Sequence, residues 1–360
     1  MAGDAPYQLH GFDVSYFTAK VRPALRYKQL WYDERRADIP EILRLTGLGF
    51  IPVVITPEGE VWQDSTDIYD RLEARRPDPP LFPASPVQRI AAHLIELYVD
   101  EVGLLPAMHY RWGSELGESS ARARFSAMMG SSELGERAAD RMVKARHMLG
   151  STPETSDAIE EHTHALFAAL SAHFEVHAYL LGERMSFADC ALMGPFYAHL
   201  WGDLVSRQLL LETAVPVVGW IERCSFPNTD QQGAWLADDA LAPELRAVLE
   251  VMGRDAAPLV LDAVRAVEEW ADSRPESLER IPRGVGLCDS KFRSTKLTHA
   301  ARTYALFSIQ RVLDTYTKLD EAGREAVDKA FRGTGFEDVL AYRPRHRMIK
   351  DGFQLAFESD

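Results

Sequence analysis

A proline-rich stretch at residues 75–86 divides this sequence into two parts with different hydrophobic patterns. The stretch, RRPDPPLFPASP, contains five prolines, which restrict the backbone and lack the N–H that helices and sheets require. Strand-like and helix-like patterns alternate before it, whereas after it apolar residues recur at the i, i+3, i+4 spacing of helices. We therefore expect an α/β domain over residues 1–82 and an all-helical domain over residues 87–225.

The N-terminal part has the segment order of a thioredoxin-like domain. Short apolar runs predict strands, helical spacing predicts helices, and a Pro-Glu-Gly turn between two apolar runs predicts a β-hairpin. In chain order the expected segments are a strand at 7–12, a helix at 18–30, a strand at 30–35, a helix at 39–47, a hairpin at 50–65 and a helix at 65–77 with Ser65 as its N-cap.

Beyond the proline-rich stretch, helical spacing predicts two groups of helices. The first group is expected at 87–112, 119–148, 155–181, 187–206 and 215–224, and the second at 242–253, 256–271, 298–319 and 321–333. Residues 226–360 therefore read as a mainly helical extension packed on the helical domain. Within it, residues 281–297 look irregular or strand-like; they could form a lid over an active cleft, or the extension could simply enlarge the core.

Charge and composition exclude several classes of partner. The chain has 360 residues, of which 40 are basic and 54 acidic, so its formal net charge is −14, and it lacks the basic footprint that nucleic acids and anionic membranes require. No signal-peptide pattern and no apolar stretch of membrane-spanning length is visible. Its three cysteines are far apart, as reduced thiols are, and no metal-type spacing occurs. We expect a cytoplasmic protein without a metal.

Four motifs, in this order and spacing, resemble the glutathione transferase family. They are SYFTAKVRPAL from residue 15, IPVV from residue 51, QDSTDIYDRLE from residue 63, and GERMSFADCALMGPFYAHLW at 182–201. In the last motif, Ser186 and Asp189 have the spacing of a capping box, which supports the fold rather than any chemistry. The resemblance is to a bacterial-type member with a long C-terminal extension, and it implies a homodimer that binds glutathione.

The resemblance also implies where glutathione lies. The Ile51–Pro52 bond would be cis and would present the backbone of Ile51 to the cysteinyl unit. At the helix that begins near Ser65, free N–H groups and the helix dipole favour an anion, so Ser65 would bind the γ-glutamyl carboxylate and Asp64 its ammonium; a plain N-cap is the alternative. Phe50 stands where many members have a lysine.

Three further residues complete the expected glutathione site. Phe17 and Gln63 lie within the motifs, and Arg35 or Arg36 could replace the lysine that is missing at Phe50, although exposed arginines are usually only solvated.

The adjacent hydroxyls of Ser15 and Tyr16 are the candidates for activating the glutathione thiol. A free thiol has a pKa near 8.5, and a hydroxyl donor at a helix N-terminus stabilises the thiolate through a charge-assisted hydrogen bond and the helix dipole. The family divides into serine-type and tyrosine-type enzymes, and this sequence matches both patterns. The short Asp-Val loop before Ser15 favours the serine type, although a structural role for both residues stays open.

A second candidate region lies on the first long helix after the proline-rich stretch. Residues 104–114 bring together Met108, His109, Tyr110, Arg111 and Trp112. This aromatic and basic cluster could line a pocket for an apolar, possibly anionic co-substrate, and core packing with a surface arginine is an equally good interpretation.

The sequence therefore indicates a glutathione transferase that activates the thiol for attack on a small apolar electrophile, by conjugation or by a lyase or dehalogenase reaction. The alternative is a non-catalytic binding or interaction protein with the same fold, which Phe50 and the long extension make credible. A basic cluster at 343–352, RPRHRMIKDG, either balances nearby carboxylates or contacts an acidic ligand group.

Overall fold

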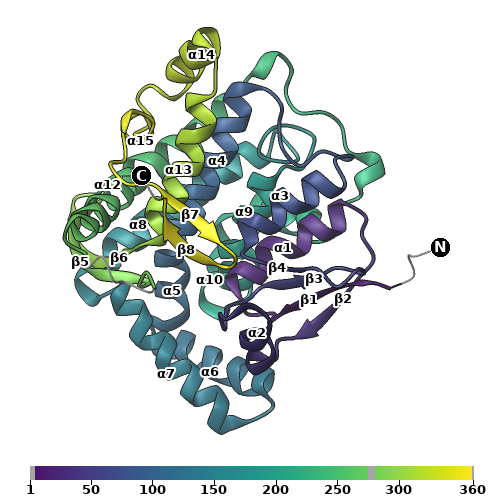
Figure 1. Cartoon of the computed structure of the whole chain (residues 1–360), viewed down its shortest axis with the longest axis vertical. Helices are drawn as coiled ribbons and strands as arrows, with labels where there is room; N and C mark the ends of the chain where they lie inside the picture. Colours follow the sequence, from purple (N-terminus) through teal and green to yellow (C-terminus); the bar gives the residue numbers. More distant parts are fainter. Residues whose placement is uncertain (1–4, 275–279, 359–360) are drawn as a thin grey trace.

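The N-terminal domain is a four-stranded mixed sheet with helices on both faces, in a computed structural model that describes residues 5–274 and 280–358. The sheet has the order β2-β1-β3-β4, with β1 and β2 parallel and the other neighbours antiparallel. Helices α1 and α3 cover one face and α2 covers the other (Figure 1). The elements are β1 (Tyr7–Gly11), α1 (Tyr16–Tyr27), β2 (Tyr32–Arg36), α2 (Ile39–Thr46), β3 (Val53–Ile55), β4 (Val61–Gln63) and α3 (Ser65–Arg75). The predicted thioredoxin-like order is confirmed.

Local sequence explains where these helices begin and end, with one correction. Gly47 closes α2 in the left-handed conformation (φ 71°), which glycine adopts without steric cost. The predicted N-cap of α3, Ser65, is wrong: Asp64 is the cap, and its carboxylate accepts the N–H of Thr66 at 3.0 Å. An aspartate reaches an N–H two residues on, so Ser65 becomes the first helical residue.

The second region is all-helical, as expected, but its helices are shorter than their periodicity suggests. The predicted helix 87–112 breaks at Gly103, where an added Cβ would lie 2.6 Å from the Tyr16 hydroxyl. The predicted helix 119–148 breaks at Gly130, which has φ 62°. The elements are α4 (Pro86–Glu101), α5 (Leu104–Trp112), α6 (Glu115–Met129), α7 (Ser132–Met148), α8 (Ser156–Phe174), α9 (Phe187–Pro195), α10 (Leu204–Thr213) and α11 (Val215–Ser225), with a π-helical turn at Phe196–Trp201.

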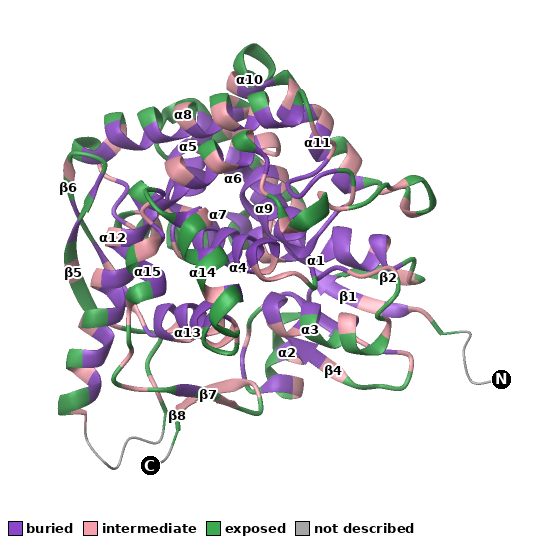
Figure 2. Ribbon diagram, turned by 90° about the horizontal axis from the view of Figure 1, so that it is seen from above, coloured by how far each residue is buried: buried purple, intermediate pink, exposed green. Residues whose placement is uncertain are grey.

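The capping box predicted for the fourth motif is present at the start of α9. The Asp189 carboxylate accepts the backbone N–H of Ser186 at 2.9 Å, and also the indole N–H of Trp220 at 3.0 Å. Helices α4 and α9 are buried along almost their whole length (Figure 2). They form the centre of the helical core.

The extension contains helices and two β-hairpins. Its elements are α12 (Pro243–Ser273), β5 (Gly284–Phe292), β6 (Thr295–Arg302), α13 (Tyr304–Thr317), α14 (Glu321–Phe331), α15 (Glu337–Ala341), β7 (Met348–Asp351) and β8 (Gln354–Phe357). Two predictions were wrong. Residues 242–253 and 256–271 form one helix, and the helix expected from 298 begins at Tyr304, because 295–302 alternate between inward and outward side chains as a strand does.

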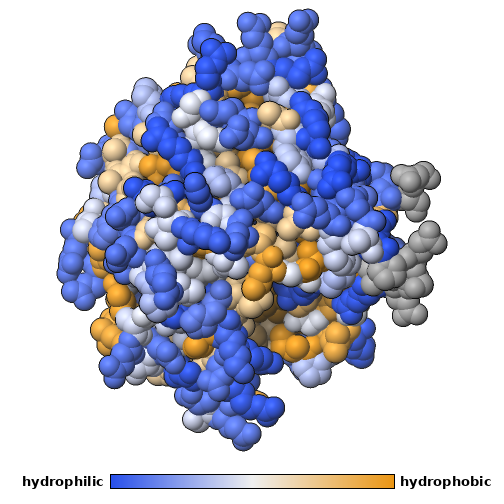
Figure 3. Space-filling view, turned by 90° about the vertical axis from the view of Figure 1, so that its left-hand side faces the viewer, coloured by the Kyte–Doolittle hydropathy of each residue, from blue (hydrophilic) through white to orange (hydrophobic). Residues whose placement is uncertain are grey.

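The extension packs its apolar side chains inward and presents a polar surface. Leu306, Ile309 and Leu313 of α13 are buried in the same core cluster as α4, as are Val260 and Val264 of α12. On the outer face of the extension, hydrophilic side chains predominate and hydrophobic ones form only separate small areas (Figure 3). The extension therefore enlarges the helical core, which is the simpler of the two roles considered for it.

No single helix within residues 5–274 and 280–358 has the length and hydropathy to cross a membrane. The consecutive helices α10 and α11 reach that threshold only when counted together, and they are bent by 116°.

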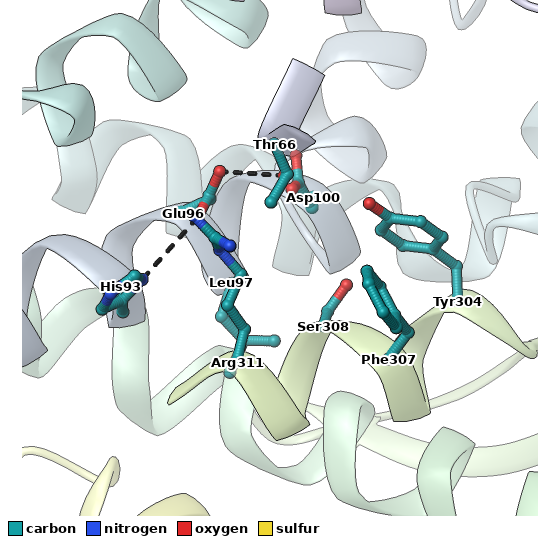
Figure 4. A pocket seen from close by; sticks show the side chains of 9 residues that line it. All are labelled: Thr66, His93, Glu96, Leu97, Asp100, Tyr304, Phe307, Ser308 and Arg311. Carbon is teal, nitrogen blue, oxygen red and sulfur yellow. Dashed lines mark hydrogen bonds and ion pairs between the residues drawn. The ribbon is translucent and has the colours of Figure 1, made fainter. Parts of the chain in front are cut away.

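A buried network of charged side chains joins the three parts of the chain. Lys20 of α1 is fully buried, with its ammonium 2.5 Å from Asp100 and 3.9 Å from Glu96, both on α4. Glu96 also accepts a hydrogen bond from the hydroxyl of Thr66 on α3 and pairs with Arg311 on α13 at 3.2 Å. Side chains from α3, α4 and α13 point toward one another around this network (Figure 4).

Burial and pairing act in opposite directions on the two carboxylates of this network. Burial raises the pKa of Asp100, and Lys20 opposes that shift. Burial also disfavours ionised Glu96, but Arg311, His93 and Lys20 outweigh it, so the pKa of Glu96 is lowered. A buried charge that loses its partner is costly, whereas a well-paired one is tolerated.

Replacing Asp100 by Ala should therefore lower the free energy of unfolding by ~3–5 kcal/mol, because the Lys20 ammonium remains buried with only the more distant Glu96. Urea unfolding followed by circular dichroism measures the loss. The double variant Lys20→Met/Asp100→Leu removes both charges, and its free energy of unfolding should fall clearly less than that of Asp100→Ala. A loss below about 1 kcal/mol for Asp100→Ala would contradict the role given to this pair.

Candidate functional site

Three segments far apart in sequence meet at one edge of the N-terminal sheet. Val53, the first residue of β3, pairs with His10 near the end of β1 and with Gln63 at the end of β4. The loop before Ser15 follows β1, Pro52 precedes Val53, and Asp64 follows β4. The strand register therefore places these three segments beside one another, and we call this region the Val53 edge.

Ser15 lies at the Val53 edge as the N-cap of α1. It is half-buried, and its hydroxyl oxygen accepts the N–H of Thr18 at 3.3 Å. Within the described part of the chain, the Ser15 hydroxyl has no acceptor for its own proton among the hydrogen bonds of the structure. The first N–H groups of α1 also lack helical partners, as at any helix start. The Ser15 hydroxyl can therefore still donate its proton, and it lies at the N-terminal, positive end of α1.

Tyr16 faces the helical domain instead. Its ring is 5% exposed, and its hydroxyl donates to the backbone carbonyl of Val99 at 2.7 Å. Burial raises the pKa of Tyr16 well above its ordinary value, with a smaller contribution from Asp100. The neighbouring Gly103 lets the hydroxyl approach the backbone closely. The Tyr16 proton is therefore already used inside the protein.

The loop that carries Ser15 is held by residues that the sequence suggested as a substrate pocket. The Val14 side chain belongs to a buried cluster with Met108 and Trp112 of α5. Arg111 is 3% exposed; it donates to the Val14 carbonyl at 3.2 Å and to the Asp203 carboxylate at 2.7 Å. Arg111 was taken as a surface or pocket group, and the structure uses it instead to fix the residue before Ser15.

The other members of that predicted pocket are also buried. Met108, Tyr110 and Trp112 are between 2% and 8% exposed, and the Trp112 ring packs edge-on against Phe125 at 5.4 Å. His109 lies 3.2 Å from Glu160 and 3.4 Å from the Ser151 hydroxyl, and burial lowers its pKa. The structure thus packs these side chains against protein groups, and their role as an electrophile pocket stays a prediction.

The segment before β3 has the expected cis bond between Ile51 and Pro52. Gln63 holds this segment from β4: its amide donates to the carbonyls of Phe50 at 2.8 Å and Leu48 at 3.2 Å. Gln63 is 6% exposed and holds the loop before β3 through these two bonds, and its contact with glutathione stays a prediction.

The side chains of Phe17 and Arg36, also predicted to contact glutathione, have partners within the protein, and that role stays a prediction. The Phe17 ring packs on Tyr16, with centroids 5.2 Å apart. The Arg36 guanidinium donates to the Met129 carbonyl of α6 at 2.7 Å. Among the contacts of residues 5–274 and 280–358, none joins either side chain to Ile51 or Asp64.

At the start of α3, the extension contacts Asp64, which was expected to bind the γ-glutamyl ammonium. One oxygen of Asp64 accepts both the Tyr304 hydroxyl at 2.6 Å and the Lys350 ammonium at 2.9 Å. Lys350, on β7, also lies 2.8 Å from Asp67, and burial raises the pKa of that carboxyl. Figure 1 shows the β7–β8 hairpin beside the N-terminal sheet. Ser65 is 3% exposed.

The residues that sequence reasoning missed are those of the extension. The Arg283 guanidinium lies 4.0 Å from the centre of the Phe50 ring, so a cation lies next to the position where the resemblance implied a lysine. Lys350 belongs to the basic cluster at 343–352 that the sequence singled out. Of the two roles predicted for that cluster, balancing nearby carboxylates agrees with the contacts of Lys350 with Asp64 and Asp67. The β5–β6 strands considered for a lid pack on α12, and it is β7–β8 that reaches α3.

Within residues 5–274 and 280–358, no group of three or more His, Cys, Asp or Glu side chains is arranged to hold a metal ion. The three cysteines are free thiols, and Cys190 and Cys224 are buried.

Comparison with known proteins identifies the N-terminal domain. Residues 9–80 match the family model of the glutathione S-transferase N-terminal domain. Similar solved structures include a glutathione S-transferase from Rhodospirillum rubrum, with 16% identity over 66% of this chain and 97% of that chain and a TM-score of 0.41. The beta-etherase LigF from Sphingobium has 18% identity over 62% of this chain and 97% of that chain, with a TM-score of 0.45.

A third similar structure is a glutathione S-transferase from Methylobacterium radiotolerans in complex with glutathione sulfonate. It has 20% identity over 66% of this chain and 100% of that chain, with a TM-score of 0.39. A comparison with curated proteins finds no match.

Replacing Tyr16 by Phe should destabilise the protein by about 1–2 kcal/mol, because the buried Val99 carbonyl loses its donor. Tyr197→Phe is the matched control, since the Tyr197 hydroxyl only reaches the exposed Asp13 at 3.4 Å, and it should cost less than about 0.5 kcal/mol. Both values come from urea unfolding. Equal losses in the two variants would contradict the buried contact of Tyr16.

Proposed function

We propose that this chain, whose residues 9–80 form a glutathione S-transferase N-terminal domain, is a glutathione transferase that activates the glutathione thiol through Ser15. The observation that carries the proposal is the Ser15 hydroxyl, which keeps its proton at the start of α1 while the Tyr16 proton is bound to Val99. Of the two hydroxyls, Ser15 is therefore the one able to donate to a thiolate.

The chemistry follows from the position of this donor. A thiol near pKa 8.5 is mostly protonated at neutral pH, and the thiolate is the nucleophile. A hydroxyl donor combined with the positive end of α1 lowers that pKa, because both stabilise the charged form. The rest of catalysis consists of holding the thiolate and an apolar electrophile in contact.

Glutathione would lie along the Val53 edge. The backbone next to the cis Ile51–Pro52 bond would face its cysteinyl unit, and the N-terminus of α3 at Ser65 would face its γ-glutamyl carboxylate. Asp64 is the acceptor for the γ-glutamyl ammonium. Met108, Arg111 and Trp112 of α5 hold the Ser15 loop through Val14. The small apolar electrophile and the homodimer stay predictions.

A non-catalytic binding protein is the second candidate, and one observation favours it. Asp64 is already bonded to Lys350 and Tyr304, so the ammonium acceptor of the site has internal partners. Calorimetry with glutathione separates the two candidates, because a transferase must bind it at millimolar concentration or below.

Replacing Ser15 by Ala should raise the pH midpoint of conjugation of a generic aryl halide by about one unit or more, toward the pKa of free glutathione. The reason is the loss of the thiolate's hydrogen-bond donor. The measurement is kcat/KM between pH 5.5 and 9.

Tyr16→Phe is the control for this profile, and its midpoint should stay within about 0.3 units of the wild type because the Tyr16 proton already binds Val99. If Tyr16→Phe shifts the midpoint and Ser15→Ala does not, Tyr16 is the activator. If neither shifts it, the activation mechanism proposed here is wrong.

A further inference from the structure

The contact between Lys350 and Asp64 joins residues that are 286 positions apart in the chain. Lys350 is 14% exposed and Asp64 is 21% exposed, so the pair is largely shielded from water. The Lys350 ammonium also lies 2.8 Å from Asp67 and 5.2 Å from the centre of the Phe307 ring. Two carboxylates and an aromatic face therefore surround this one cation.

The Asp64 carboxylate has little capacity left for another donor. One oxygen accepts the Thr66 N–H at 3.0 Å, which caps α3. The other accepts Tyr304 at 2.6 Å and Lys350 at 2.9 Å, which uses both of its lone pairs. A ligand ammonium at this oxygen would have to displace Lys350, and if Lys350 remained, the two cations would repel each other.

The hairpin that carries Lys350 is anchored to the extension by contacts that do not involve Lys350. The side-chain amide of Gln310 on α13 binds the backbone of Met348 at 2.9 and 2.8 Å, and Arg347 forms a two-point ion pair with Asp314. The base of the hairpin is therefore fixed, while its lysine reaches across to α3. Replacing Lys350 leaves these anchors in place.

We propose that Lys350 is an internal competitor for the ammonium group of glutathione at Asp64, and that it sets the ligand specificity of this site. The inference rests on the proposed function, because it assumes that glutathione binds at the Val53 edge. A ligand with a free ammonium at its γ-glutamyl end must displace Lys350, whereas a thiol ligand whose amino group is acylated does not. The site thus disfavours the ammonium that Asp64 would otherwise recognise.

The test compares two ligands on two proteins by isothermal titration calorimetry. The ligands are glutathione and N-acetylglutathione, and the proteins are the full-length wild type and Lys350→Met. In the wild type, glutathione should bind no more tightly than N-acetylglutathione. In Lys350→Met, the affinity for glutathione should rise about 10-fold or more, because the ligand ammonium can then form a charged hydrogen bond with Asp64. The affinity for N-acetylglutathione should rise by less than about 3-fold.

Lys296→Met is the matched control. Lys296 is an exposed lysine of β6 that pairs with Asp289, and its replacement removes the same charge from the extension away from Asp64. It should leave both affinities unchanged.

Other outcomes contradict the inference in distinguishable ways. If wild type and Lys350→Met bind glutathione equally well, the function stands and the competition is wrong. If Lys350→Met raises the affinities for both ligands equally, the β7–β8 hairpin only covers the site and does not compete for Asp64. If neither protein binds either ligand, the proposed function fails and the inference fails with it.

A second measurement on the wild type needs no variant that might fold poorly. Saturating glutathione should speed amide hydrogen exchange in β7 and β8, since Lys350 must leave Asp64, and N-acetylglutathione should not. Equal exchange with both ligands would overturn the inference.

Discussion

The buried pairing of Lys20 with Asp100 and Glu96 is the interaction on which the rest of the structure depends. It places a cation from the N-terminal domain between two carboxylates of the central helix α4. Arg311 of the extension then pairs with the same Glu96, so all three parts of the chain share one set of charges. Because an unpaired charge at this depth is costly, the three parts are constrained to keep one relative position.

That fixed position is what assembles the candidate site. The Ser15 loop is held from the helical domain by Arg111 and by the packing of Val14, while the strand register at Val53 aligns the cis-proline segment and the start of α3. Arg111 in particular acts through the Val14 carbonyl, and its location on α5 explains why it resembled a pocket residue.

The extension changes the charges around the candidate site more than it changes the fold of the N-terminal domain. Most of it enlarges the helical core, as α12 and α13 do. Its hairpin, however, brings Lys350 to Asp64, and the preceding segment brings Arg283 to Phe50. Two cations from the extension thus lie at the Val53 edge, where the N-terminal motif by itself has an unpaired aspartate and an apolar phenylalanine. The extension thus adds positive charge next to the residues expected to bind glutathione.

The sequence by itself determined the thioredoxin-like order, the Gly47 helix end, the Ser186–Asp189 capping box and the family of the N-terminal domain. Each helix end or capping box depends on residues within a few positions of one another, and the segment order follows from such local patterns taken in sequence. The sequence did not show that the Tyr16 hydroxyl donates to the Val99 carbonyl, 83 positions away, or that α5 buries His109 and Arg111. The partner of Asp64 also came from the tertiary structure, because only packing brings together side chains separated by most of the chain.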